Sequence, residues 1–132
     1  METSYDQKRL LRELESTGKW GTDAVKIGIR AKFRCEYCGK DLLKSLENYK
    51  EWNIDHIVPQ SDGGRDTMAN LALSCRTCNV SLKGQWNPRT VIGENGGRAK
   101  LLGEAKKYIE SKRNEAEKEL KEFRKIVKQC TI

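Results

Sequence analysis

The chain has 132 residues, of which 36% are hydrophobic and 34% charged, and its formal net charge is +7. This length favours one domain with a small core, a kind of domain that a bound metal often stabilises. No run approaches the roughly 18 apolar residues of a membrane helix and no signal-peptide core is recognisable, so we expect neither a membrane span nor an exported chain.

The positive charge is concentrated towards the C-terminus. Residues 1–97 carry 15 Lys/Arg and 13 Asp/Glu, whereas residues 98–132 carry 11 and 6. A basic excess favours a polyanionic partner such as nucleic acid, because binding releases counterions. Charge alone leaves a second interpretation open, in which it serves only solubility.

The N-terminal part is predicted to be helical. An apolar stripe predicts a helix over residues 4–15, and Gly18 is its expected terminator. A second, short helix is expected over residues 22–31, with Thr22 or Asp23 as its N-cap. The stripe of the first helix consists of Leu10, Leu11 and Leu14.

The middle of the chain reads as two strands followed by a helix. Residues 41–50 fit either a short helix or a loop, and residues 51–58 fit a strand with alternating faces. A polar loop around Asp62-Gly63-Gly64 then leads to a returning strand over residues 71–74. A helix is expected from Cys75 to Lys83.

The C-terminal third is predicted to be one long helix from Arg98 to about Gln129, after a glycine-rich loop. Two interpretations of this helix remain: packing or dimerisation through its apolar stripe, or contact of its basic side chains with DNA. Its mixed charges favour the first. The stripe consists of Leu101, Ala105, Tyr108, Ile109, Leu120, Phe123 and Val127.

The expected fold class is therefore α+β, with a small two-stranded core and flanking helices. We expect a single domain over residues 1–132. Its segments are a helical part (1–31), the core (32–84), the glycine-rich loop (85–97) and the basic helix (98–132).

Four of the five cysteines form two C-x-x-C pairs, and two such pairs are a strong metal-site signal. Four thiolates leave no open position, so they predict a structural, tetrahedral zinc site in a reducing cytoplasm. A redox dithiol is the competing interpretation of a single pair. Cys130 is interpreted as incidental. The zinc ligands are Cys35, Cys38, Cys75 and Cys78.

The one histidine, His56, directly follows Asp55. On a strand these side chains point to opposite sides, so one can bind a metal while the other faces a substrate. Asn79 follows the last zinc cysteine and is fixed as rigidly as the zinc site itself.

These residues resemble a known family. The motifs that carry the similarity are, in chain order, Cys35-x-x-Cys38, Asp55-His56-Ile57-Val58-Pro59, Gly63-Gly64, Asn70-Leu71 and Cys75-x-x-Cys78-Asn79-x-x-x-Lys83-Gly84. The sequence is similar to the HNH nucleases of the zinc-clamped ββα-metal type. The resemblance covers about residues 30–84. The last family position, often histidine, is asparagine here, which gives an H-N-N version.

The resemblance implies a metal-dependent endonuclease that cuts DNA, most simply double-stranded DNA, to 5′-phosphate and 3′-hydroxyl ends. It implies that Asp55 and Asn79 bind a divalent cation and that His56 is the general base. It also implies that Asn70 holds the loop that presents His56. Small units of this kind occur in prokaryotic and phage settings: restriction, mobile-element homing, DNA packaging and antiphage defence.

The chemistry of the residues agrees with these implied roles. A carboxylate and an amide oxygen are hard ligands that suit Mg²⁺ or Mn²⁺. A histidine with an ordinary pKa near ~6.5 is mostly neutral at cellular pH and can accept a proton. Candidate phosphate contacts are Lys83, Arg76 and Arg65, each of which also fits a solvated surface charge.

Two functions of other classes remain as alternatives: a zinc-dependent nucleic-acid-binding module without chemistry, and a scaffold protein that uses the long helix. The aromatic side chains of Trp52, Trp86 and Tyr37 fit base stacking, but packing inside the protein is the favoured interpretation. A homodimer through the C-terminal helix is a further expectation, because one HNH unit has a single cutting centre.

Overall fold

A computed structural model of the chain describes residues 4–132. Two short helices, α1 (Gln7–Ser16) and α2 (Thr22–Ala31), precede the core, and the one-turn helix α3 (Leu46–Lys50) leads into it. The core consists of strands β1 (Trp52–His56) and β2 (Leu71–Cys75) and the helix η3 (Thr77–Lys83). The loop between the strands contains two 3-10 turns, η1 (Gln60–Asp62) and η2 (Met68–Asn70). The predicted mixed fold with a small two-stranded sheet is confirmed.

The two strands form an antiparallel pair whose register sets the layout of the molecule. Trp52 lies opposite Cys75 at one end, and His56 lies opposite Leu71 at the other. Every residue of β2 is buried, whereas on β1 only Asp55 is buried. A strand buried on both faces needs cover from two sides, and helices α2 and α5 (Arg98–Gln129) provide it.

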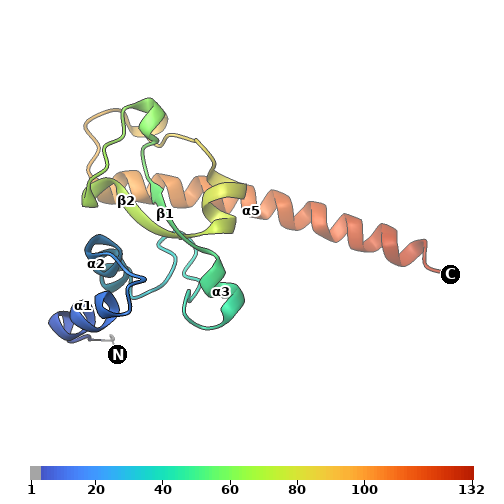
Figure 1. The fold of residues 1–132 in the computed structure, drawn as a ribbon. Helices are drawn as coiled ribbons and strands as arrows, with labels where there is room; N and C mark the ends of the chain where they lie inside the picture. Colours follow the sequence, from blue (N-terminus) through green and yellow to red (C-terminus); the bar gives the residue numbers. More distant parts are fainter. Residues whose placement is uncertain (1–3) are drawn as a thin grey trace.

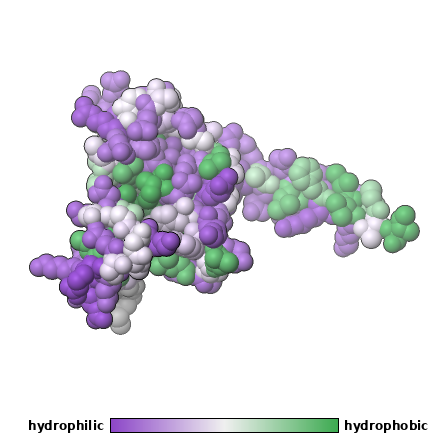
Figure 2. Space-filling view, viewed as in Figure 1, coloured by the Kyte–Doolittle hydropathy of each residue, from purple (hydrophilic) through white to green (hydrophobic). Residues whose placement is uncertain are grey.

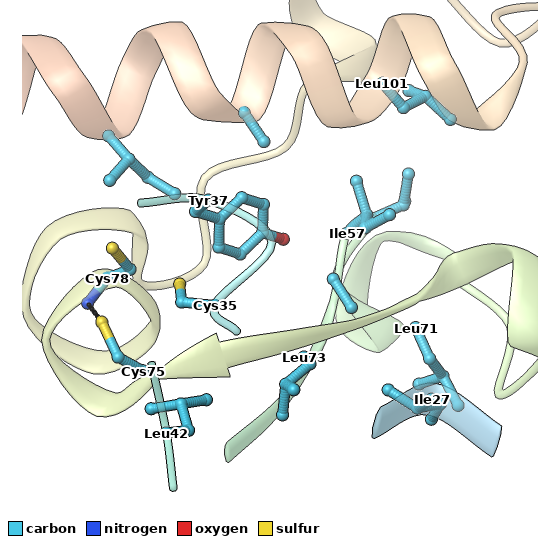
Figure 3. Packing of buried hydrophobic residues seen from close by; sticks show 14 residues of the cluster. Ile27, Cys35, Tyr37, Leu42, Ile57, Leu71, Leu73, Cys75, Cys78 and Leu101 are labelled. Atoms are coloured by element: carbon cyan, nitrogen blue, oxygen red, sulfur yellow. Dashed lines mark hydrogen bonds between the residues drawn. The ribbon is translucent and has the colours of Figure 1, made fainter. Parts of the chain in front are cut away.

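The hydrophobic core lies between the sheet, the sulfur-rich turns and the first half of α5 (Figure 3). The ring of Tyr37 lies between α5 and the sheet, with its hydroxyl pointing away from the cysteine sulfurs (Figure 3). Sixteen hydrophobic residues within residues 4–132 are buried, a small core for a chain of this length. Its largest members are Ile27, Leu42, Ile57, Leu73 and Ile109.

A half-buried glutamate joins three separate segments at the edge of β2. The carboxylate of Glu36 accepts hydrogen bonds from Arg30 of α2 (3.0 Å), from Arg98 of α5 (2.9 Å) and from the backbone N–H of Leu73 (2.7 Å). Both arginines also donate to the Leu71 carbonyl oxygen. Shared acceptors of this kind fix the positions of α2 and α5 on the sheet.

The N-terminal helices pack on the sheet through aromatic rings. The ring of Trp20 lies 4.7 Å from that of Trp52 and 6.1 Å from that of Phe33. Gly28 allows this packing, since a Cβ there would lie 2.7 Å from the Phe33 ring. The predicted cap of α2 is wrong: its N-cap is Gly21, without a side-chain bond, and Thr22 donates to Glu15 instead.

Three predicted segments differ in detail. Helix η3 has π-type rather than α-type hydrogen bonding, and the Gly84 N–H bonds to the Asn79 carbonyl oxygen, five residues back. The glycine-rich loop is interrupted by a single helical turn, α4 (Arg89–Ile92). The ambiguous segment before β1 ends in α3, whose N-cap Ser45 accepts a bond from the Asn48 N–H.

Helix α5 continues far beyond the rest of the molecule (Figure 1). Only its first half is packed, through Leu101, Ala105 and Ile109. The predicted stripe is therefore half right, because Leu120, Phe123 and Val127 are exposed. Hydrophobic residues line one side of this distal arm (Figure 2), which we define as residues 114–129.

None of the helices within residues 4–132 combines the length and the hydrophobicity that a membrane crossing requires.

Candidate functional site

The four paired cysteines converge at one end of the sheet. Their sulfur atoms all lie within 4.8 Å of one another, and those of Cys38 and Cys75 are 3.7 Å apart. Sulfurs on a tetrahedral zinc ion, with Zn–S near ~2.3 Å, lie about 3.8 Å apart. The residues therefore fit a four-coordinate zinc ion, and the predicted structural zinc site is supported. Figure 3 shows three of these sulfurs close together beside η3.

Backbone and side-chain donors surround the sulfur cluster. The N–H groups of Cys38 and Cys78 each lie 3.4 Å from the sulfur three residues earlier, a geometry that stabilises thiolates. Hydrogen bonds from the three neighbouring thiols lower the pKa of Cys35. The guanidinium of Arg113 donates to the Cys78 sulfur at 3.0 Å, which ties α5 to the cluster. No pattern in the sequence indicates this contact across 35 residues.

A second contact links the two cysteine turns to the start of β1. The carboxylate of Glu51 accepts from Lys40 (2.5 Å) beside the first pair and from the Thr77 hydroxyl (2.7 Å) beside the second. The Arg76 N–H also donates to the Glu51 carbonyl oxygen. These bonds lower the pKa of Glu51, Lys40 contributing most.

Asp55 is buried, with 7% of its surface exposed, and its Oδ2 atom has two strong partners. The Tyr37 hydroxyl donates to it at 2.6 Å and the Lys83 ammonium lies 3.1 Å away. Burial raises the pKa of Asp55, and the charge of Lys83 and the bond from Tyr37 oppose that rise. Burial and the Asp55 charge likewise raise the pKa of Tyr37. The structure thus holds one carboxylate oxygen of Asp55 firmly in place.

Lys83 was expected to contact phosphate, and the structure corrects that expectation. Its side chain is 0% exposed, and its ammonium also donates to the His56 carbonyl oxygen at 3.2 Å. A lysine buried in this way serves as the counter-ion of Asp55, because an unpaired buried charge is very costly. It joins η3 to β1 and is not available at the surface.

His56 lies on the opposite side of β1 from Asp55, as the alternation of the strand predicts. Its imidazole is partly exposed, and its Nε2 atom lies 3.1 Å from a carboxylate oxygen of Asp66 in the following loop. This contact leaves Nδ1 without a partner among the described residues. Asp66 was missed by the sequence reasoning, since a lone acidic residue in a polar loop carries no signal.

Asn70 closes the loop between the strands. Its side chain accepts from the Val58 N–H (2.9 Å) and donates to the carbonyl oxygens of Val58 (3.0 Å) and Arg65 (2.9 Å). Gly64 is required at this closure, since a Cβ there would lie 1.8 Å from the Val58 carbonyl oxygen. The three bonds of Asn70 thus tie Val58 to Arg65, the residue that precedes Asp66.

The remaining expected site residues lie in different parts of the core: Arg65 in the loop after β1, Arg76 directly after β2 and Asn79 on η3. Asn79 is half-buried on η3, four residues before Lys83, and its side chain has no hydrogen-bond partner in residues 4–132. It therefore forms no hydrogen bond with Asp55 or His56. Arg65 and Arg76 are exposed, as a phosphate contact would be.

Comparison with known proteins identifies one family. Residues 35–85 match the family model described as HNH endonuclease. No curated protein and no solved structure matches the chain. The matched segment contains both cysteine pairs, β1, β2 and η3, and it leaves out α1, α2, α4 and α5. The resemblance seen in the sequence is confirmed: this segment matches the HNH family model, which suggests a nuclease or nucleic-acid-binding module.

Proposed function

From the HNH domain over residues 35–85, we propose that the chain is a metal-dependent endonuclease that hydrolyses phosphodiester bonds of double-stranded DNA. The observation that carries the proposal is the pairing of a partly exposed imidazole with the Asp66 carboxylate, on the strand that buries Asp55. A binding module without chemistry has no need for an oriented imidazole beside a buried carboxylate. We propose further that residues 1–132 form a single domain.

His56 is proposed as the general base that takes a proton from the attacking water. The Asp66 carboxylate at Nε2 favours the tautomer with the proton on that nitrogen. Nδ1 then carries the free lone pair that a base requires. The bonds of Asn70 to Val58 and Arg65 hold the loop that supplies Asp66, so Asn70 positions His56 through this loop.

Asp55 and Asn79 are proposed as ligands of Mg²⁺ or Mn²⁺. The donor set fits: Tyr37 and Lys83 both bind Oδ2 of Asp55, which leaves Oδ1 available, and the Asn79 amide has no partner in residues 4–132. When bound, the ion would supply a Lewis acid for the phosphate and the departing 3′ oxygen. Cleavage would leave 5′-phosphate and 3′-hydroxyl ends.

Nicking of supercoiled plasmid tests the proposal. The purified protein should convert supercoiled to open-circular DNA in Mg²⁺ or Mn²⁺ and should stop when EDTA is added. Labelling of the new ends should succeed with polymerase at the 3′-hydroxyl. Binding of DNA without any nicking in either metal would favour the zinc-dependent binding module instead.

The two proposed metal ligands have a test of their own. Asp55→Asn and Asn79→Ala should raise the Mg²⁺ or Mn²⁺ concentration for half-maximal nicking or abolish nicking. Gln85→Ala, an exposed substitution within the same domain, serves as the control. Unchanged metal dependence in both ligand variants would contradict the assignment.

The distal arm supports a second proposal, that two copies of the chain pair through it. Leu120, Phe123 and Val127 have the spacing of a coiled-coil seam and are exposed. Residues 114–120 carry three glutamates and one lysine, whereas residues 121–129 carry four Lys/Arg and one glutamate. Antiparallel pairing of two arms places the acidic half of each beside the basic half of the other, and parallel pairing would place like charges together. A dimer would supply two cutting centres, as a double-strand break requires.

Sedimentation equilibrium tests the pairing, with Cys130→Ser present throughout to exclude disulfide dimers. The protein should dimerise reversibly, and Leu120→Glu with Val127→Glu should be monomeric with an unchanged helical circular dichroism signal. A monomer at every concentration would overturn this proposal and leave the nuclease proposal intact.

A further inference from the structure

A small cavity of about 200 Å³ lies where the loop after β1 meets the segment from α4 to the start of α5. Figure 1 shows these two stretches, near residues 60–70 and 85–97, together at one end of the molecule. Three arginines, Arg65, Arg89 and Arg98, line the cavity, and none of its lining residues is acidic. Its volume admits a tetrahedral anion together with water.

Donor atoms of this cavity lack acceptors. The Nε atoms of Arg89 and Arg98 are buried and have no hydrogen-bond partner in the described chain. The guanidinium groups of Arg65 and Arg89 have no carboxylate within ion-pair distance in residues 4–132, whereas Arg98 is paired with Glu36. Buried donors without acceptors are rare in folded proteins and destabilising, so the described chain leaves the arginines of this cavity incompletely satisfied.

The cavity is also adjacent to the proposed base. Arg65, which lines the cavity, directly precedes Asp66, which binds the His56 imidazole. Asn70 lines the cavity as well, and it fixes the Arg65 carbonyl oxygen through its amide. An anion in the cavity would therefore lie close to the phosphate at His56.

We propose that this cavity is a phosphate-binding site that takes a backbone phosphate flanking the one to be cut, with Arg65 and Arg89 as the principal contacts. The inference rests on the proposed nuclease function and adds a substrate subsite that extends beyond the residues matched to the family, since Arg89 and Arg98 follow residue 85. Planar guanidinium groups suit this role, because they bind two phosphate oxygens at once.

Arg65 and Arg89 are the residues to change, because their side chains form no internal ion pair in residues 4–132. Binding of a 20-base-pair duplex is measured by fluorescence anisotropy in EDTA, so that no cleavage occurs. The doubly substituted Arg65→Ala/Arg89→Ala protein should bind at least tenfold more weakly. Its slope of log affinity against log salt should decrease by about 1, since one phosphate contact is lost.

The matched control is Arg12→Ala/Lys19→Ala, which removes the same charge from exposed positions at α1 and just after it. This control should change affinity by less than threefold. Equal losses in the two proteins would show that net charge alone matters and would overturn the proposal. Unchanged affinity in the Arg65/Arg89 protein would overturn it as well.

Free phosphate shares the chemistry of a backbone phosphate, so a second arm separates the two. Inorganic phosphate is titrated into both proteins by isothermal calorimetry. Phosphate binding that is lost in the Arg65/Arg89 protein, with duplex affinity unchanged, would assign the cavity to the free anion and overturn the backbone proposal. If duplex binding depends on the cavity but the protein does not nick plasmid, the phosphate-binding site stands and the nuclease function is rejected.

Discussion

The two ends of the β1–β2 hairpin differ in how they are held. At the end with Trp52 and Cys75, four sulfurs, the Glu51 carboxylate and Arg113 of α5 form a closed set of contacts. At the end with His56 and Leu71, an exposed polar loop is held by Asn70 and by the close approach of Gly64 to Val58. The first end provides rigidity through contacts that join residues far apart in the chain. The second leaves an imidazole and several arginines accessible, as a site that meets a polymer requires.

The largest effect should come from the sulfur end. Cys75→Ser removes one of four zinc ligands, and the folding free energy that the ion contributes, on the order of 10 kcal/mol, is lost with it. The variant should be unfolded by circular dichroism and should lack the one zinc per chain of the unaltered protein. Cys130→Ser, an exposed cysteine outside the cluster, should keep both the fold and the zinc. A folded, zinc-free Cys75→Ser protein would show that the contacts around the cluster suffice without the ion.

Removal of the buried lysine between the two ends should have the next largest effect. Lys83→Ala leaves the Asp55 carboxylate buried and unpaired, which costs about 3–5 kcal/mol in the free energy of unfolding. Urea denaturation measures it, with Lys100→Ala at an exposed position as the control. A loss below about 1 kcal/mol would mean that Lys83 is not the counter-ion of Asp55 in solution.

The loop end has its own sensitive position. Gly64→Ala forces a Cβ against the Val58 carbonyl oxygen and should destabilise the fold by about 1–3 kcal/mol, with a loss of cleavage beyond the loss of stability. Gly63→Ala is the matched control, since Gly63 has φ +89° but no atom near its absent Cβ. That control should cost only the backbone strain, about 1 kcal/mol. Equal effects of the two substitutions would remove the special role of the contact with Val58.

The smallest effect concerns Glu51 and is dependent on pH. The lowered pKa of Glu51 means that its ionised form stabilises the fold at neutral pH and that this contribution is lost as the pH falls through its folded pKa. Glu51→Gln should therefore cost about 1–2 kcal/mol at pH 7, and the difference should shrink below pH 4. Glu47→Gln, exposed on α3, should have no such profile. A loss that is constant with pH would contradict the assignment to charge.

The sequence predicted what depends on local pattern. Cysteine spacing identified the sulfur cluster, and the strand alternation placed Asp55 and His56 on opposite faces. The strand rule involves residues that are close together in the chain. The cysteine rule involves side chains that, at this spacing, usually bind a metal. The helix and strand bounds followed within a few residues for the same reason.

Contacts between distant residues had no such signal. Nothing in the sequence distinguishes the buried Lys83 from a surface lysine, because burial depends on how distant segments pack. Nor does the sequence pair Arg113 with Cys78, since that contact depends on where α5 packs. The apolar stripe of α5 looks the same where it meets the core and where it projects beyond it. In the structure Phe123 lies beyond the core, and its side chain is exposed rather than packed against the described chain. The sequence pattern alone does not reveal this.

The most direct test of the central claim is a parallel measurement of plasmid nicking and duplex binding for His56→Ala and for the unaltered protein. The account predicts that nicking in Mg²⁺ or Mn²⁺ falls by about 10²–10⁴-fold, the usual contribution of a general base, while duplex affinity and thermal stability stay unchanged. Nicking by His56→Ala at the rate of the unaltered protein would contradict it.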